Sequence, residues 1–428
     1  MLQAIVNAFK LPDLRRKLLF TFSMLILFRF IAHVPVPGVN QTALTNLFQG
    51  NTLLGMLDLF SGGAMTSFSI AAMGVYPYIT ASIIMQLLVP IIPKLDEMAK
   101  EGESGRMRIN QITHWLTVPL AALQGYGTAS LLAGGNPPII SNFGLSGDRF
   151  VPTLAIIASM TAGTILLVWM GELITENGIG NGVSIIIFGG IVARLPEMVF
   201  RSVFAEQNYA AMVVFIILGL LTVAAIVVVQ EAQRRIPVQY AKRVRGIRVQ
   251  GGGSTHIPLR VNSAGMIPLI FAMSIMLFPG YIATFFQGSS NEIVSGIAGF
   301  VVRNLGTTSV LYSAFYFLLV VGFTFFYTMV IFQQQHLAEN LQKYGGFIPG
   351  IRPGKPTEQF LDRILYRITW LGALFLGAVA ILPFLTQSLS ATLVLSSTGL
   401  LIVVGVVLDT MKQLEAQLLM RHYEGFIK

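Results

Sequence analysis

Ten long apolar runs constrain this chain more than any other feature of its sequence. Each run has about 20 residues, the length at which an α-helix crosses about 30 Å of hydrocarbon. Only 11% of the residues are charged, against about 25% in soluble domains. The pattern therefore predicts an all-α polytopic membrane protein with ten transmembrane helices. The runs lie near residues 18–34, 70–92, 110–133, 152–171, 180–199, 211–230, 262–286, 308–332, 368–387 and 391–411.

Basic residues set the predicted orientation. They concentrate in alternate gaps between the runs, so that 23 of the 28 Lys and Arg residues fall on one side of a membrane. Because cytoplasmic loops carry the excess of Lys and Arg, that side is predicted to be cytoplasmic, with both termini on it. The gap at 172–180 contains neither Lys nor Arg, and its side follows from parity alone. The opposite gaps hold only Arg149, Arg194, Arg201 and Arg303.

The composition excludes several kinds of chemistry. The chain has no cysteine, and its five histidines lack metal-ligand spacing, so neither a metal site nor a cofactor is expected. No phosphate-binding loop is present, because Gly354-Lys355 is followed by Pro356 and lacks the upstream glycine. An intramembrane enzyme would need paired Asp residues, a Ser/His pair or a metal constellation in the runs, and none is found. The chain is predicted not to be an enzyme, and any driven movement needs an external motor.

Residues 55–69 depart from a plain helical bundle. They are half apolar, too short to cross a bilayer, and interrupted by Gly62-Gly63. One interpretation is an external loop with a short surface helix, and the other is a re-entrant segment that fills a pore. Irregular backbone facing hydrocarbon would leave polar groups unpaired, at several kcal/mol each. Within a bilayer, such a segment must therefore lie in protein or line a watery cavity.

Ionisable residues are nearly absent from the middle of the runs. Arg29 lies late in the first run and is expected to snorkel outward, while Glu172, Glu231 and Asp409 lie at run ends. Secondary transporters, the main alternative class, usually place such residues in mid-span, so this alternative is disfavoured. Uncharged polar residues do occur in the runs, and each alone is explained by an interhelical hydrogen bond.

Two predicted cytoplasmic loops, about 232–260 and 333–366, are more basic than topology requires. The first is rich in β-formers and has a Gly-rich turn, which predicts a hairpin. The second presents Arg352 on a tip that is stiffened by Gly and Pro. Topology, or attraction to anionic lipid, would account for part of this charge. Two stiff basic projections on one face favour docking of an acidic partner, such as RNA or an acidic protein surface.

A series of motifs, in order from about residue 12 to 424, resembles the SecY family, whose members are the central subunit of the Sec protein-conducting channel. The motifs are Leu59-Phe-Ser-Gly-Gly-Ala, Met73-Gly-Val-Tyr-Pro-Tyr-Ile-Thr-Ala-Ser-Ile-Ile-Met-Gln-Leu-Leu, Lys100-Glu-Gly-Glu-Ser-Gly-Arg, Gly178-Ile-Gly-Asn-Gly-Val-Ser-Ile-Ile-Ile-Phe, Gln233-Arg-Arg-Ile, Tyr240-Ala-Lys-Arg, Ser254-Thr-His-Ile-Pro-Leu-Arg-Val-Asn and Phe347-Ile-Pro-Gly-Ile-Arg-Pro-Gly.

The resemblance implies two inverted five-helix halves, about 1–200 and 205–428, around a central hourglass pore. It implies a channel that moves secretory polypeptides across the bacterial cytoplasmic membrane and releases transmembrane segments sideways into it. A short re-entrant plug helix, matching about 55–69, would close the pore through Leu57, Phe60, Ser61, Gly62 and Gly63. A hydrophobic ring at the waist would exclude ions by dewetting, and it matches Val75, Ile79, Val183, Ile187, Ile270 and Ile402.

The same resemblance implies a lateral gate and a docking face. The gate would open between the second and third spans on one side and the seventh and eighth on the other, near Thr80, Gln86, Gln124 and Asn262. A SecA ATPase or a ribosome would dock on Lys242, Arg243, Arg245 and Arg352. The implied partners also include small membrane subunits resembling SecE and SecG, signal peptides, translocating polypeptides and membrane lipid.

Overall fold

The computed structural model describes most of the chain. The described residues are 9, 11–40, 42–44, 61–133, 139–140, 143–144, 147–204, 209–240, 243–245, 248–250, 253–286, 291–304, 309–334, 337–386 and 396–424.

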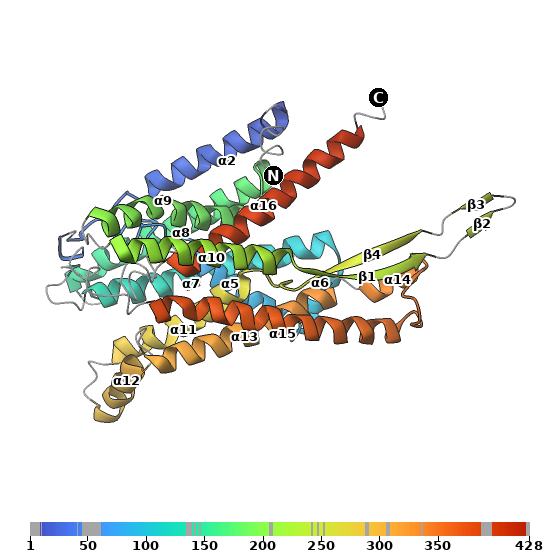
Figure 1. Ribbon diagram of the computed structural model, residues 1–428. Coiled ribbons are helices and arrows are strands. Elements are labelled where there is room, and N and C mark those ends of the chain that lie inside the picture. Colours follow the sequence, from blue (N-terminus) through green and yellow to red (C-terminus); the bar gives the residue numbers. More distant parts are fainter. Residues whose placement is uncertain are drawn as a thin grey trace.

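The chain folds mainly into long helices that lie side by side in one bundle (Figure 1). Each of the ten predicted apolar runs lies largely on a helix. The ten helices are α2 (Pro12–Ile31), α5 (Tyr76–Leu88), α7 (Glu103–Ala133), α8 (Phe150–Asn177), α9 (Gly182–Phe204), α10 (Tyr209–Glu231), α11 (Ile267–Phe286), α13 (Val310–Gln334), α15 (Lys355–Thr386) and α16 (Ser396–Glu424). Shorter helical elements connect them: α6 (Pro93–Lys100), the 3-10 turn η1 (Gly147–Arg149), α12 (Glu292–Asn304) and α14 (Leu337–Lys343).

Length and composition set which helices could cross a membrane. Within the described part of the chain, α8, α13 and α15 are each long and apolar enough. A fourth span results if α5 and α6, which meet at an angle of 98°, are counted together. Proline lies in the first turn of α2, α5 and α6, where its fixed φ suits a helix start and its missing N–H is not needed.

A tight turn between α8 and α9 shows how local sequence positions the interior. The Thr175 hydroxyl accepts a hydrogen bond from the Gly182 amide at 2.9 Å, and the Asn181 side chain caps α9 by accepting from the Ser184 amide at 3.1 Å. A Cβ on Gly182 would lie 1.8 Å from the Gly171 carbonyl oxygen, so only glycine fits there. This turn fixes the start of α9, directly before Val183.

A small sheet, ordered β4-β1-β5, lies at one end of the bundle, opposite to α12 (Figure 1). The sheet confirms the predicted hairpin in the first basic loop, where β1 (Gln233–Tyr240) pairs antiparallel with β4 (Ser254–Arg260). Beyond it, β2 (Arg243–Arg245) pairs with β3 (Arg248–Gln250) at the tip. The second basic loop adds β5 (Gly346–Phe347) to the free edge of β1. The two predicted projections therefore share one sheet.

Apolar side chains at this end form their own core. Buried residues from β1, β4, α14 and α15 pack together with Ile348, which follows β5. The members are Ile236, Val238, Leu259, Leu341, Ile348, Leu361 and Ile364. The two basic loops are consequently held together by packing as well as by strand pairing.

The buried core of the bundle consists of separate clusters that draw their residues from different parts of the chain. One large cluster draws its buried members from α10, α11, α13, α15 and α16, all after residue 205, and Tyr76 of α5 packs against it. Another joins α2, α8, α9 and residues 64–75 to Ile402 and Val406 of α16. Helix α16 thus contributes buried residues to both of these cores.

Candidate pore constriction, plug and docking surface

Five of the six predicted ring residues meet in one apolar cluster. Val75 at the start of α5, Ile187 on α9 and Ile402 on α16 are buried members, with exposed fractions of 2%, 3% and 0%. Ile79 and Val183 are partly buried and pack against them. The four-residue spacings 75/79 and 183/187 place each pair on one helix face. The sixth, Ile270 on α11, is buried but is not a member of this cluster, against which Met266, directly before α11, packs instead.

The predicted plug is described from Ser61 onward, and Leu57 and Phe60 lie outside the described residues. Residues 62–68 form successive turns rather than a regular helix. Ser61 is 2% exposed, and Ala64 is fully buried in the cluster that holds the ring residues. Such burial favours the re-entrant interpretation of this segment over an exposed loop.

Two glycines bring this segment into backbone contact with α9. A Cβ built on Gly62 would lie 2.6 Å from the Gly190 Cα atom, and one built on Gly190 would lie 2.7 Å from the Gly62 Cα atom. Gly62 and Gly63 also have φ angles of +67° and +90°, a region that favours glycine. Gly62, predicted as an interruption of the segment and as a plug residue, is therefore also its point of backbone contact with α9.

The expectation that Arg29 snorkels outward is wrong. Its Nη1 atom donates a hydrogen bond of 2.7 Å to the Gly62 carbonyl oxygen. The guanidinium is therefore directed toward the segment after residue 60, because a polar partner within the protein is available there.

The predicted gate residues only partly come together. Gln124 on α7 lies with its Nε2 atom 3.5 Å from the Thr80 hydroxyl on α5. Gln86 donates instead to Ser82 in its own helix at 3.3 Å, and Asn262 donates to the Gly265 carbonyl of its own turn at 3.0 Å. Among the described residues, the side-chain oxygens of Gln86, Gln124 and Asn262 are buried without a hydrogen-bond partner.

A contact across the same seam was not predicted. Tyr76 on α5 packs against the buried cluster that includes Leu269 and Met273 of α11, and α11 packs on both α5 and α7. Nothing in the spacing of these residues could have identified the contact, since Tyr76 and α11 are far apart in sequence. It links the two sides of the predicted gate.

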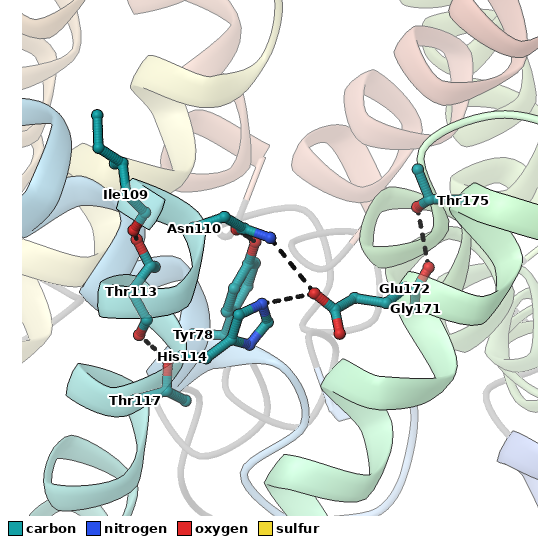
Figure 2. Close-up of polar contacts among 9 residues, drawn as sticks. All are labelled: Tyr78, Ile109, Asn110, Thr113, His114, Thr117, Gly171, Glu172 and Thr175. Carbon is teal, nitrogen blue, oxygen red and sulfur yellow. Dashed lines mark hydrogen bonds and ion pairs between the residues drawn. The ribbon is translucent and has the colours of Figure 1, made fainter. Parts of the chain in front are cut away.

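Sequence reasoning also missed a polar cluster where α5, α7 and α8 meet (Figure 2). The His114 Nε2 atom lies 2.6 Å from a carboxylate oxygen of Glu172, and Asn110 donates to the same oxygen at 3.4 Å. The Tyr78 ring stacks on His114 with a centroid distance of 5.4 Å, and its hydroxyl donates to Asn110 at 3.4 Å. Glu172, predicted only as a run-end charge, thus connects three helices.

The predicted docking residues lie at the end that carries the sheet. Arg243 and Arg245 are on β2, whose backbone pairs with β3, while Lys242 lies outside the described residues. Arg352 is exposed, and its carbonyl accepts a 2.9 Å hydrogen bond from the Thr357 hydroxyl at the start of α15. Gly350 and Gly354 on either side have positive φ angles of +83° and +98°. The tip is therefore a loop with a defined backbone conformation that is attached to both the sheet and α15.

Across the described part of the chain, no three His, Cys, Asp or Glu side chains gather closely enough to hold a metal ion.

The chain matches the family model described as SecY over residues 69–411. It is 47% identical to the protein translocase subunit SecY of Halalkalibacterium halodurans over 441 residues, covering all of both chains. It is 44% identical to the subunit of that name from Thermotoga maritima over 436 residues, covering all of this chain and 98% of the relative.

Solved structures of low sequence identity share the fold. One, described as the structure of a protein conducting channel, superposes with a TM-score of 0.62 at 16% identity and 96% coverage of both chains. Another, Sec61 in the canine ribosome-channel complex from the endoplasmic reticulum, gives a TM-score of 0.60 at 16% identity with the same coverage.

Proposed function

The chain belongs to the SecY family and is a multi-pass membrane protein that forms a protein translocation channel; from this premise we propose how its own residues seal, open and drive that channel. The proposed channel carries secretory polypeptides across the bacterial cytoplasmic membrane and releases transmembrane segments sideways into lipid. All ten apolar helices cross the membrane in this proposal, with both termini in the cytoplasm. Its bacterial relatives and the distribution of basic residues support this orientation.

We infer two five-helix halves, 1–200 and 205–428, around the pore. The apolar cluster whose buried members all follow residue 205 supports a second half with a core of its own. An odd number of spans inverts the second half relative to the first, which is the arrangement of inverted-repeat membrane proteins. The proposed halves then meet where α16 joins the other cluster through Ile402 and Val406, and where α11 packs on α5 and α7.

The seal is proposed to consist of the aliphatic ring, Val75, Ile79, Val183, Ile187, Ile270 and Ile402, with residues 55–69 as the plug. An ion that passes a constriction of aliphatic side chains must lose its hydration without gaining a ligand, so the constriction excludes ions. Burial of Ala64 in the same cluster as Val75 and Ile187 supports a closed arrangement in which plug and ring make one apolar body.

The lateral gate is proposed to lie along the seam of α5 and α7 against α11. The packing of α11 on α5 and α7, the Gln124–Thr80 contact and the buried side-chain oxygens of Gln86 and Gln124 support a seam that contains polar groups. A signal sequence with ten Leu-like residues gains roughly 3 to 6 kcal/mol in lipid, at about 0.3 to 0.6 kcal/mol each. That free energy favours its exit through this seam, while a soluble segment stays in the wet path.

The motor is proposed to dock on the sheet end, at Lys242, Arg243, Arg245 and Arg352. A SecA ATPase and a ribosome are the candidate motors, and the ribosome-bound relatives among the solved structures support the second. Subunits resembling SecE and SecG are proposed to complete the complex in the membrane. We infer no enzymatic activity for this chain, so that the motor supplies all of the driving free energy.

The observation that carries the proposal is the joining of α5, α9 and α16 by ring residues in one cluster. The absence of cysteine from the sequence allows a direct test. Ile79→Cys and Ile402→Cys channels, reconstituted with their partners, are expected to crosslink to a stalled secretory precursor that carries a cysteine. Ile217→Cys, at a 53% exposed position on α10, is the control and is expected not to crosslink. Translocation without any crosslink at Ile79 or Ile402 would move the path elsewhere.

A further inference from the structure

Arg29 links the last turn of α2 to a segment more than thirty residues later. Its Nη1 atom donates to the Gly62 carbonyl oxygen at 2.7 Å. The large side chains around it on the outer surface of α2 are apolar and exposed, namely Ile26, Leu27 and Phe30. A basic residue within such a span marks a functional site by default, because its charge needs a partner. Here that partner is a backbone carbonyl of the predicted plug.

The carbonyl oxygen of Gly62 in turn needs a hydrogen-bond donor. Its neighbourhood is apolar, since Phe28 and Ala64 belong to the cluster that contains the ring residues. A buried carbonyl that loses its donor costs free energy unless water replaces the donor. A hydrogen bond from a charged donor is also shorter and stronger than a neutral one. The Arg29–Gly62 bond thus gives the carbonyl of the buried Gly62 a charged donor.

The rest of the segment is held by other means. Its later part is tied to the chain after α2 by the Ile70 amide, which donates to the Val34 carbonyl at 3.0 Å, and by the Val36 amide, which donates to the Phe68 carbonyl at 2.9 Å. Gly62 and Gly63 have no side chain with which to hold themselves against α9. The start of the segment is held by the burial of Ala64 in the apolar cluster, by the backbone contact of Gly62 with Gly190, and by the charged hydrogen bond from Arg29.

We propose that Arg29 is a positioning residue that keeps residues 61–66 seated against Gly190 in the closed channel. This inference rests on the proposed function, in which residues 55–69 act as the plug. The bond is strong in a dry, apolar site and weak in water, because water competes for both the guanidinium and the carbonyl. A hydrated polypeptide that enters the pore therefore loosens the plug without any need to pull on it.

The experiment measures how far Ala64 is protected from solvent. Ala64 is fully buried and the sequence has no other cysteine to react. Ala64→Cys is placed in the complete channel complex in proteoliposomes, without a motor, and the rate of alkylation by a membrane-impermeant maleimide is recorded. Arg29→Met keeps the length of the side chain but removes its donors. It is expected to raise the rate by about tenfold or more, the size expected on losing a hydrogen bond to a charged group.

Two controls separate release of the segment from general loosening. Arg29→Lys keeps the charge and a donor, and is expected to restore a rate within about threefold of the parent. Ala380→Cys, fully buried on α15 in the other large cluster, is expected to stay unreactive in all three backgrounds. An unchanged rate at Ala64→Cys in Arg29→Met, or an equal rise at Ala380→Cys, would overturn the role of Arg29.

Ion leak through the same proteoliposomes tests the proposed function separately. If Arg29→Met exposes Ala64→Cys and the vesicles also leak, the segment is both held by Arg29 and part of the seal. Exposure of Ala64→Cys with no leak would leave Arg29 as the positioning residue and refute the sealing role of residues 55–69.

Discussion

Replacing Gly190 by alanine should open the resting channel, because the added methyl group meets backbone rather than a movable side chain. The new Cβ atom would lie 2.7 Å from the Gly62 Cα atom and 3.2 Å from its nitrogen. Since carbon atoms in contact are normally about 3.5–4.0 Å apart, either the segment or α9 must move by about 1 Å. Helix α9 is a continuous helix through this point, so the segment after residue 60 is expected to move.

The magnitude follows from two opposing terms. Overpacking a tight contact costs typically about 1–3 kcal/mol, and here the cost falls on the seated state alone. Alanine in place of glycine inside a helix stabilises the helix by roughly 0.5–1 kcal/mol, in both the seated and unseated states. The unseated population is therefore expected to rise by about 5- to 150-fold, while the unfolding free energy of the seated state falls by up to about 2.5 kcal/mol once the helix gain is subtracted.

The neighbouring glycine provides a matched control. A Cβ on Gly189 would lie 2.6 Å from the Leu25 Cδ2 atom, which is the far end of a flexible side chain, and its next contacts are at 3.7 and 3.8 Å. Gly189→Ala is therefore expected to gain the same helix propensity without unseating the segment. The assay is the rate of iodide leak from proteoliposomes without a motor. A rise in Gly190→Ala alone is expected; equal rates in both variants, or no rise in either, would refute the packing argument.

Three further variants test other parts of the arrangement. Ile402→Ala removes a fully buried side chain from the ring cluster. It is expected to lower the unfolding free energy by about 2–5 kcal/mol and to raise the rate of ion leak. Normal stability and a normal seal would argue against the place of Ile402 in the ring. Arg352→Glu reverses an exposed charge and should impair motor-driven translocation, while the ion leak through the channel without a motor stays unchanged. Normal translocation with both SecA and ribosomes would show that Arg352 does not belong to the docking face. Glu172→Gln removes the negative charge that faces His114, whose side chain is 28% exposed against 41% for Glu172. Because solvent screens such a pair, chemical unfolding should show a loss of about 1 kcal/mol at most.

Features encoded by local pattern could be predicted from the sequence. Each apolar run of about 20 residues became a helix because hydrocarbon leaves the backbone few other ways to satisfy its hydrogen bonds. The hairpin was predicted because β-formers flank a Gly turn, and Gln233 to Gln239 indeed pair with Arg260 to Ser254. The pairing of Arg245 with Arg248 places the reversal between these two residues. Both features depend on residues that are close in sequence.

Features that depend on distant partners could not be predicted from composition or spacing. The direction of Arg29 depends on Gly62, and the backbone contact of Gly62 depends on Gly190. In the sequence His114 is one of five scattered histidines, and only the packing of α8 places a carboxylate oxygen of Glu172 2.6 Å from its Nε2 atom. A valine or isoleucine of the ring has the same chemistry as one that faces lipid, so only the resemblance to a family singled out these positions. The Asn262 side chain donates to the Gly265 carbonyl of its own turn, and its place at the lateral gate stays a prediction.

The shared core of the two basic loops has a consequence for exchanging parts between related channels. Ile236 and Val238 of the hairpin pack against Ile348 of the second loop and Leu361 of α15, and β5 pairs with the edge of β1. A chimera that imports one loop from a relative would join two surfaces shaped for different neighbours. The two loops and the first turns of α15 therefore form one transferable module, and partner preference should move between channels only when all three are exchanged together.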